Sequence, residues 1–361
     1  MDRHRCLRFL YCVFILSTVA RSQLGSAAQF GPMVAVDSAL PAPSGTYSLV
    51  HQGDGLIDSS RADPFSKGAK VQFVTVEPDV RLEVLDWGGS GRSLIFLAGN
   101  GDTAHSFDSF AQKFTSRNHV YGITRRGFGA SSKPTPANGN YSADHLGDDV
   151  LAVMQALRIE HPVLVGHSVA GEELSSIGSR FPNKVSGLIY LDAAASWAFY
   201  DPAHPRVEIE MNSIKKRIEE IEAGGVDEQA KLRELEIAIA RFETVLHQSN
   251  EDVKTMPPLP PRSPIQAALN FGAEKYTSIP VPVLAIFACP HDWSRFFPND
   301  PGRRAARLAA DTAGCSARAE SFARGVPTAR VVRIPNADHY VYRSNEPQVI
   351  DEMKKFLSTL P

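Results

Sequence analysis

Eight short apolar runs, most of them separated by segments of helical periodicity, constrain the fold of this chain more than any other feature. Most of the later runs are continuously apolar, as expected of parallel strands covered by helices on both faces. The first two runs flank EPD and read as a hairpin. The runs are VQFVTV (71–76), RLEVLDW (81–87), SLIFLAG (93–99), HVYGIT (119–124), PVLVGH (162–167), SGLIYLD (186–192), VPVLAIFA (281–288) and ARVVRIP (329–335); the helical segments are 105–114, 142–157, 171–181, 302–314 and 346–360. The alternation predicts an α/β fold, doubly wound, with a mostly parallel eight-stranded sheet and helices on both faces.

One charged segment interrupts this alternation. Residues 207–248 have helical character on either side of AGGVD at 223–227. Apolar residues recur there at helical spacing: Ile214, Ile218 and Ile221 before the break, and Leu232, Leu235, Ile239, Phe242 and Leu246 after it. This pattern predicts a helical hairpin, followed by a stiff proline-rich linker at 256–264. A hairpin inserted between two core strands is most simply a lid over a pocket, and an arm for homodimer formation is the alternative.

The amino terminus is typical of an export signal. A basic head precedes an apolar stretch from about Leu7 to Ala20, followed by small and polar residues. This stretch is short for a membrane span and contains Arg8, so we expect export to a periplasmic or extracellular location and no stable membrane anchor. The expected divisions are 1–28 for the signal and cleavage region, 29–70 for an extended lead-in, 71–196 and 277–361 for the two parts of the core, and 197–276 for the cap.

Charge and cysteine content exclude some classes of function. The formal net charge of −2 over 361 residues gives no reason to expect a nucleic acid or an anionic membrane as partner. Of the four cysteines, Cys6 and Cys12 would leave with the signal. Cys289 and Cys315 are then either bridged, as an oxidising compartment permits, or two free thiols. Neither has a second cysteine at metal-ligand spacing, so we expect no metal site.

The stretch LVGHSVAGEEL, at 164–174, carries the most specific chemistry. An apolar run ends in a sharp turn at Ser168, with Gly166 before it and Ala170 and Gly171 after it, and a helical segment follows. This is the arrangement of a nucleophile elbow, in which small neighbours let strand and helix pass close to an exposed serine hydroxyl. The alternative is an ordinary turn serine.

A serine nucleophile needs a base and a group that orients the base. His339, in NADHYVYR after the last strand, is the best-placed histidine for the base. Asp292, after the penultimate strand, is the first candidate for the acid and would give the order Ser168, Asp292, His339. Asp192, at the end of the preceding strand, is the alternative acid.

Acyl transfer also requires donors for the developing oxyanion. The amide of Val169, directly after the nucleophile, is one candidate. The second is the amide of Asn100, in the glycine-rich stretch AGNGDT at 98–103. An ordinary strand-to-helix turn is the alternative for that stretch.

Together these motifs resemble those of the α/β-hydrolase superfamily, and specifically its capped, esterase-like members. The resemblance runs from about Val71 to the C-terminus and includes LAGNG, RGFGASS (126–132), GHSVAG, PHD and ADH. In that family the cap enters after the sixth strand, where the charged hairpin falls here. The chain departs from the usual pattern in having Ala98-Gly99 in place of His-Gly, Thr124 in place of an aspartate, and Ala288 in place of a glycine before the acid loop.

The leading hypothesis is a serine hydrolase that cleaves a small, partly apolar carboxylic ester through an acyl-enzyme, without a metal or organic cofactor. The same triad on this fold also supports cleavage of C–C bonds, amides or lactones, and cofactor-free peroxidase chemistry. A non-catalytic binding protein on the hydrolase scaffold is the alternative from a different class. A serine at the elbow argues against haloalkane dehalogenases and epoxide hydrolases, whose elbows carry aspartate.

Overall fold

The structure is a computed structural model that describes residues 49–52, 55–58, 68–194, 197–203, 205–224, 227–255 and 261–361, with the backbone alone at 49–52, 55–58, 228 and 248–255. These residues belong to one compact unit, Tyr47–Pro361. The predicted signal at 1–28 lies outside the described residues, as does most of the lead-in. Within the lead-in, β1 (Leu49–Gln52) and β2 (Gly55–Asp58) pair antiparallel.

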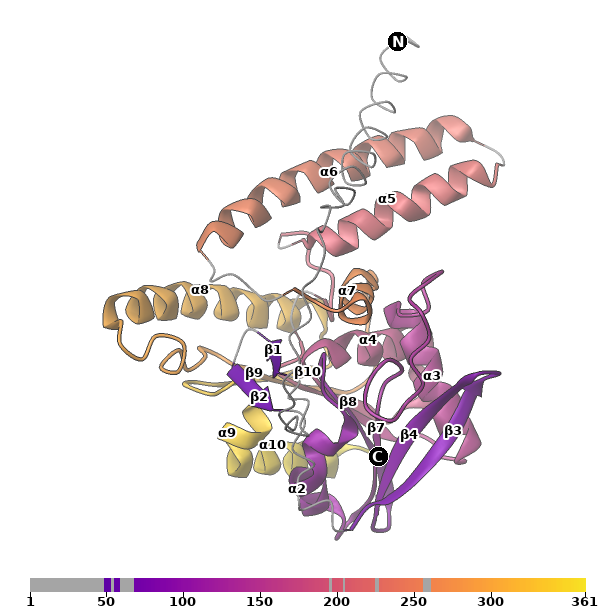
Figure 1. Cartoon of the computed structure of the whole chain (residues 1–361), viewed down its shortest axis with the longest axis vertical. Coiled ribbons are helices and arrows are strands. Elements are labelled where there is room, and N and C mark those ends of the chain that lie inside the picture. Colours follow the sequence, from indigo (N-terminus) through magenta and orange to yellow (C-terminus); the bar gives the residue numbers. More distant parts are fainter. Residues whose placement is uncertain are drawn as a thin grey trace, which may run out of the picture. The chain divides into compact units, whose positions relative to one another are not determined.

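An eight-stranded sheet forms the centre of this unit (Figure 1). Its order is β10-β9-β8-β7-β5-β6-β4-β3; β3, β4 and β6 pair antiparallel and all other neighbours pair parallel. The strands are β3 (Lys70–Glu77), β4 (Val80–Gly88), β5 (Arg92–Leu97), β6 (Asn118–Ile123), β7 (Val163–His167), β8 (Gly187–Leu191), β9 (Val283–Ala288) and β10 (Ala329–Ile334). The predicted fold class is confirmed, including the hairpin of the first two strands.

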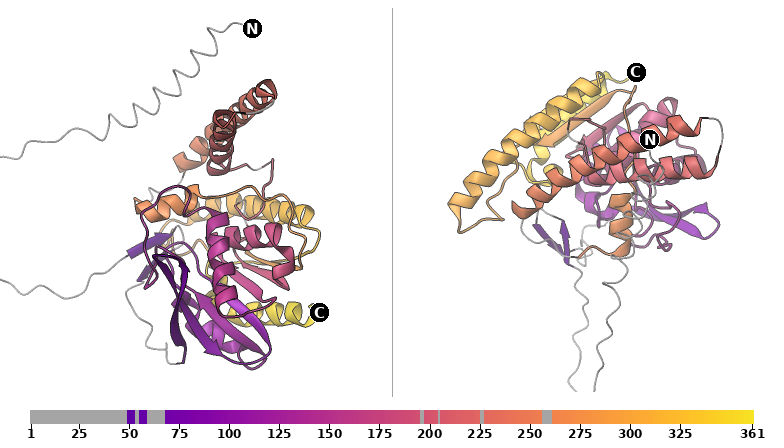
Figure 2. Two further views of the ribbon diagram at one scale, coloured as in Figure 1. Left: turned by 90° about the vertical axis from the view of Figure 1, so that its right-hand side faces the viewer. Right: turned by 90° about the horizontal axis from the view of Figure 1, so that it is seen from above.

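Helices cover both faces of the sheet and bury two apolar cores (Figure 2). One core packs against α3 (Ala143–Ala156), α4 (Gly171–Arg180) and α8 (Pro301–Gly325). The other packs against α2 (Asp108–Ala111), α9 (Val341–Ser344) and α10 (Glu346–Thr359). The central strands β7, β8 and β9 are buried at every position, because side chains on both sides of each strand face a helical layer. Short 3-10 turns complete the connections: η1 (Ala104–Phe107), η2 (Gln112–Phe114), η3 (Ser168–Ala170) and η4 (Pro182–Lys184).

Helices α8 and α7 differ from the sequence expectation. α8 continues eleven residues past the predicted end at Gly314, because Cys315, Ala319 and Phe322 extend its buried stripe. That burial outweighs the roughly 1 kcal/mol that a glycine costs inside a helix. α7 (Pro264–Phe271) was not predicted. Its start is nevertheless marked in the sequence: Ser263 and Gln266 form a capping box around a proline in the first turn.

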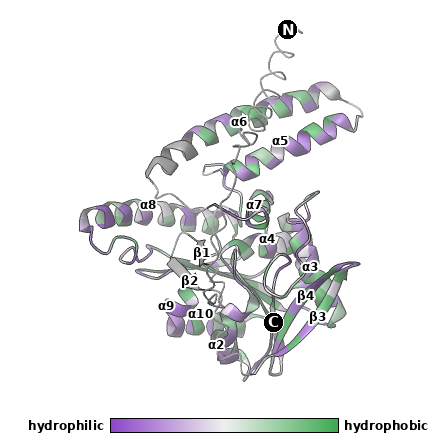
Figure 3. Ribbon diagram, in the orientation of Figure 1, coloured by the Kyte–Doolittle hydropathy of each residue, from purple (hydrophilic) through white to green (hydrophobic). Residues whose placement is uncertain are grey.

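The charged segment folds into α5 (Val207–Glu222) and α6 (Glu228–Thr255), which run side by side (Figure 1). Polar and apolar residues alternate along both helices (Figure 3). Ile209 and Val245 are buried, but Ile237 is 64% exposed. Asn212 anchors α5 by donating to the carbonyls of Phe271 and Ala273. A lid and a dimerisation arm both stay predictions for this hairpin. Within the described part of the chain, no helix combines the length and the apolar character that a membrane span requires.

Candidate active site

Ser168 occupies a strained turn between β7 and α4. Its φ of 55° lies in the left-handed region, which costs a residue with a side chain free energy and is typical of a functional constraint. The glycines around it are required for packing. A Cβ at Gly166 would come within 2.7 Å of Leu174, and one at Gly171 within 2.1 Å of the carbonyl oxygen of Ala193. The local sequence therefore forces strand and helix together and places the serine at the junction.

His339 follows β10 and contacts Asp192, which follows β8. The Nδ1 atom of His339 lies 2.6 Å from Oδ2 of Asp192. The other carboxylate oxygen of Asp192 accepts a hydrogen bond of 3.0 Å from the amide of Ala288. Burial opposes ionisation of Asp192, but hydrogen bonds from His291 and His339 outweigh it and hold the pKa of this carboxyl far below its usual range. Asp192 is therefore an ionised acceptor that orients the imidazole of His339.

Asp292, the first candidate for the acid, does not occupy this position. Its exposed carboxylate accepts hydrogen bonds from the amide and hydroxyl of Ser294, at 2.8 and 2.9 Å. The hydrogen bond from the Ser294 amide, followed by that from its hydroxyl, lowers the pKa of Asp292. The preceding residue, His291, pairs in register with Ala337, so the backbone is extended there and successive side chains point to opposite sides. His291 consequently faces inward and Asp292 outward, and the geometry favours the alternative acid, Asp192.

His167 joins the elbow to the loop that carries His339. Its ring is fully buried, and Nε2 lies 3.1 Å from the carbonyl oxygen of His339. Burial is the main cause that lowers the pKa of His167 well below its usual value. A neutral His167 therefore donates from Nε2 to that carbonyl. Tyr340 adds a second tie, because its hydroxyl donates to Asp102 in the loop after β5, at 2.9 Å.

The loop after β5 passes directly beside Ser168. A Cβ placed on Gly99 would lie 3.3 Å from Cβ of Ser168 and 3.0 Å from Nδ1 of His167. Asn100 follows Gly99, and Val169 follows Ser168, so both predicted oxyanion donors belong to the segments that flank the serine. Their donation to an oxyanion stays a prediction.

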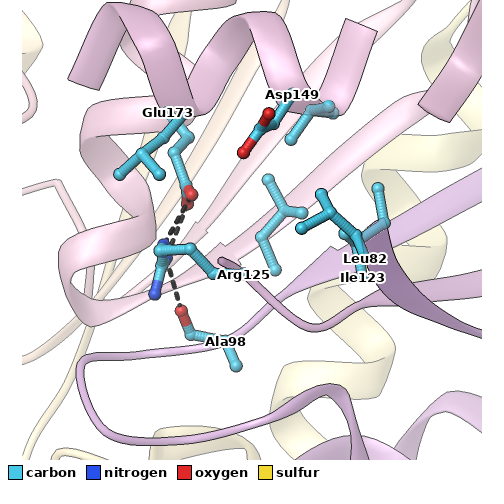
Figure 4. A pocket seen from close by; sticks show the side chains of 9 residues that line it. Leu82, Ala98, Ile123, Arg125, Asp149 and Glu173 are labelled. Atoms are coloured by element: carbon cyan, nitrogen blue, oxygen red, sulfur yellow. Dashed lines mark hydrogen bonds and ion pairs between the residues drawn. The ribbon is translucent and has the colours of Figure 1, made fainter. Parts of the chain in front are cut away.

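A buried ion pair holds this loop against the helix behind the elbow (Figure 4). Arg125 donates to both carboxylate oxygens of Glu173 on α4, each at 2.6 Å. The same guanidinium donates to the carbonyls of Ala98, at 2.8 Å, and Gly99, at 3.3 Å. A small internal cavity beside this pair has room for about one water molecule. Sequence reasoning missed this pair; its only signal was two adjacent glutamates four and five residues after Ser168.

His291 was also missed as a site residue. Its Nε2 lies 2.9 Å from the same Asp192 oxygen that contacts His339. Its Nδ1 lies 3.1 Å from Oδ2 of Asp311 on α8. A disulfide between Cys289 and Cys315 connects the loop after β9 to α8, so of the two alternatives for these cysteines the structure contains the bridge.

Within the described residues, two groups of side chains bring together atoms of the kinds that bind metals. They are Asp192, His291 and His339, and Glu77, His145 and Asp149. In the first group, the facing nitrogen and oxygen atoms hydrogen bond to one another. In the second, the guanidinium of Arg126 already pairs with Glu77 and Asp149. Neither arrangement therefore offers free ligand atoms for a cation.

Comparisons with known proteins agree with this architecture. A family model described as alpha/beta hydrolase fold matches residues 92–212. The chain is 26% identical over 104 residues to 2-(acetamidomethylene)succinate hydrolase of Mesorhizobium japonicum, covering 29% of this chain and 36% of that protein. It is 32% identical over 114 residues to a bifunctional esterase/perhydrolase of Acinetobacter calcoaceticus, covering 31% of this chain and 40% of that protein. A bromoperoxidase structure from Bacillus anthracis aligns with a TM-score of 0.51 at 16% identity, covering 80% of this chain and 100% of the other.

The fold and the elbow define an α/β hydrolase. The family model and the curated relatives confirm the predicted resemblance to the α/β-hydrolase superfamily. The matched stretches span only 36% and 40% of the two curated relatives. What those relatives act on is therefore a property of those proteins, and the activity of this chain is a proposal.

Proposed function

We propose that this protein is a serine hydrolase that cleaves carboxylic esters through an acyl-enzyme. One observation carries the proposal. Ser168 stands in a left-handed turn at the end of β7, and the neighbouring strand β8 is followed directly by Asp192, whose carboxylate contacts the imidazole of His339. Nucleophile, base and acid in these positions are what acyl transfer through a serine requires.

The proposed reaction begins with attack of the Ser168 oxygen on the ester carbonyl carbon. His339 accepts the serine proton at Nε2, because its Nδ1–H donates to Asp192 and the lone pair is then on Nε2. The amides of Val169 and Asn100 hold the oxyanion. Collapse of the intermediate breaks the C–O bond, and His339 returns the proton to the leaving alcohol. Water, activated by the same imidazole, then releases the acid.

The surroundings of the nucleophile support a partly apolar substrate. Ser168 is 7% and His339 8% exposed, so the site is enclosed. Val169 belongs to a small apolar cluster with Phe128 and Leu269 of α7. Trp197, where the chain leaves the core for the hairpin, donates from its ring nitrogen to the Ser168 carbonyl at 3.2 Å. Amide, lactone or C–C cleavage and peroxidase chemistry would use the same nucleophile and are distinguished by substrate.

Labelling and hydrolysis of model esters test the proposal. The purified chain should hydrolyse p-nitrophenyl acetate and butyrate, and a fluorophosphonate probe should modify Ser168, as located by mass spectrometry. Ser168→Ala should abolish both, whereas Ser358→Ala, on the exposed surface of α10, should change neither. If the probe leaves Ser168 unmodified and both the parent protein and Ser168→Ala are inactive, the binding-protein alternative replaces the enzyme.

We also propose that the protein is exported. The pattern of residues 1–28 favours a cleaved signal, and a Cys289–Cys315 bridge suits an oxidising compartment. Expression of the full chain in a bacterium with fractionation of periplasm and medium, followed by N-terminal sequencing, tests this. An uncleaved cytoplasmic product would contradict it.

A further inference from the structure

His291 lies between two buried carboxylates, one of which belongs to the proposed triad. Its Nε2 is 2.9 Å from Oδ2 of Asp192, and its Nδ1 is 3.1 Å from Oδ2 of Asp311. Both acids are largely buried, with side-chain exposures of 9% and 4%. The Oδ2 atom of Asp192 therefore has two imidazoles as neighbours, His339 at 2.6 Å and His291.

Three separate connections hold His291 in this place. Its amide donates to Asp311, at 2.7 Å, so both backbone and ring are attached to α8. The Cys289–Cys315 bridge joins the loop to the same helix, one turn from Asp311. On the other side, the amide of Asp292 donates to the carbonyl of Ala337, in the loop that carries His339. The ring is therefore fixed by the fold.

The charges around His291 come from three elements. Asp192 faces it from the end of β8, Asp311 from α8, and His339 from the loop after β10, with ring centroids 6.4 Å apart. Arg318 approaches the far side of Asp311, at 4.0 Å. A carboxylate only accepts hydrogen bonds, so each nitrogen of His291 must carry a proton and the ring is a cation. Burial opposes this charge, but the hydrogen bonds to Asp192 and Asp311 outweigh it and raise the pKa of His291 to about 10.

We propose that His291 is a positioning residue, a fixed imidazolium that shares the Asp192 carboxylate with His339 and keeps His339 in its neutral, proton-accepting form. This rests on the proposed function. Alone, the negative charge of Asp192 would stabilise a protonated His339 and raise the pH at which the base becomes available. A cation on the same carboxylate oxygen offsets that effect. His291 thereby extends activity toward lower pH, which a purely structural role would not do.

The pH dependence of kcat/KM tests this role. The acidic limb reports the pKa of the free enzyme's base. In His291→Gln the side-chain amide can still donate to Asp192 but carries no charge, so the limb should move upward by roughly one pH unit. Asp311→Asn, which weakens the hold on the cation, should move it in the same direction by less. The matched control is His119→Gln. It removes a part-exposed histidine on β6 whose Nε2 lies 2.8 Å from Oδ1 of Asp86 on β4, and it should leave the acidic limb in place.

A second measurement reads the charge of His291 in the unchanged protein. Nitrogen-15 NMR of the histidine-labelled full chain should show two imidazoles with both nitrogens protonated from neutral to alkaline pH: His291, and His105, which also lies between two carboxylates, those of Glu83 and Asp108. A neutral His291 spectrum overturns the proposal. So does a folded, active His291→Gln whose acidic limb superimposes on that of the parent protein. If Ser168→Ala retains full activity, the proposed function fails instead, and the NMR result still decides the charge of His291.

Discussion

Charged side chains are used differently at the carboxyl edge of the sheet and along the helical hairpin. At the edge, Arg125 and Glu173 are almost fully buried and bind each other through two hydrogen bonds. On the hairpin, Arg217 pairs with Glu234, yet their side chains are 33% and 54% exposed. Exposed pairs contribute about 0–1 kcal/mol, whereas breaking a buried pair costs several times more. Charges at the edge therefore determine geometry, and charges on the hairpin mainly keep it hydrated.

The difference shows which parts of the molecule tolerate change. At the edge, Asp192, His291 and Asp311 form one connected set, and removing a member leaves a buried partner without its counter-charge. Along α5 and α6, apolar positions are partly exposed and a lost ion pair is replaced by water. The change in unfolding free energy or activity caused by a substitution should consequently differ between the two regions by an order of magnitude or more.

The largest expected effect concerns the two aspartates predicted for the acid. Asp192→Asn should lower kcat for ester hydrolysis by about 10³- to 10⁴-fold, because the imidazole of His339 loses the carboxylate that sets its tautomer. The kcat of Asp292→Asn should remain within about twofold of that of the parent protein, because in the described part of the chain the Asp292 carboxylate hydrogen bonds only to Ser294. Steady-state kinetics on p-nitrophenyl butyrate measure both. Equal losses in the two variants would mean that Asp292 has a part in catalysis.

The next effect separates two adjacent glutamates on α4. Glu173→Gln should destabilise the protein by about 3–5 kcal/mol, because the buried guanidinium of Arg125 is left without its counter-charge. Glu172→Gln provides the matched control: Glu172 is equally buried, but its carboxylate accepts no hydrogen bond in the described part of the chain, and Arg206 is 3.7 Å away. Urea denaturation near neutral pH should therefore show a large loss only for Glu173→Gln. Comparable losses would refute the distinction.

A smaller effect is the pH dependence that Glu172 introduces. Burial raises its pKa to about 8, from about 4.5 in the unfolded chain. The stabilisation linked to this raised pKa is present below about pH 4.5 and is lost as the pH rises toward 8. The unfolding free energy of the parent protein should therefore fall with rising pH between about pH 5.5 and about pH 7.5. In Glu172→Gln that fall should be smaller by about 2 kcal/mol, because the titrating carboxyl is gone. Chemical denaturation at both pH values measures this, and parallel pH curves for the two proteins would contradict it.

The smallest effect belongs to the hairpin. Glu234→Gln removes the partner of Arg217, and the unfolding free energy should change by less than about 0.5 kcal/mol, because both groups remain solvated. Melting experiments at low and at high salt provide the measurement. A loss above about 2 kcal/mol would show that the hairpin charges are buried against something else, such as a second copy of the chain.

Much of the fold follows from patterns within short segments. The eight apolar runs became eight strands, with ends displaced by no more than two residues. The central strands β7, β8 and β9 were the clearest, because a strand buried on both faces needs an uninterrupted apolar sequence. The elbow was equally local, since Gly166, Ser168 and Gly171 specify the turn by themselves. The extent of α8 was harder to predict, because burial of its apolar stripe in the folded protein extends it past Gly314. The presence of α7 was missed because its start is marked only by a capping box.

The sequence by itself indicated the α/β-hydrolase fold, the candidate nucleophile Ser168 and the candidate base His339, because each depends on residues that are close together in the chain. Only the tertiary structure decided which carboxylate meets that base. His339 and Asp192 are 147 residues apart, and one step of an extended backbone turns His291 inward and Asp292 outward. The sequence lists His291 and Asp292 side by side. Which of the two side chains faces the site depends on the register of His291 with Ala337, a contact between segments that are distant in the chain.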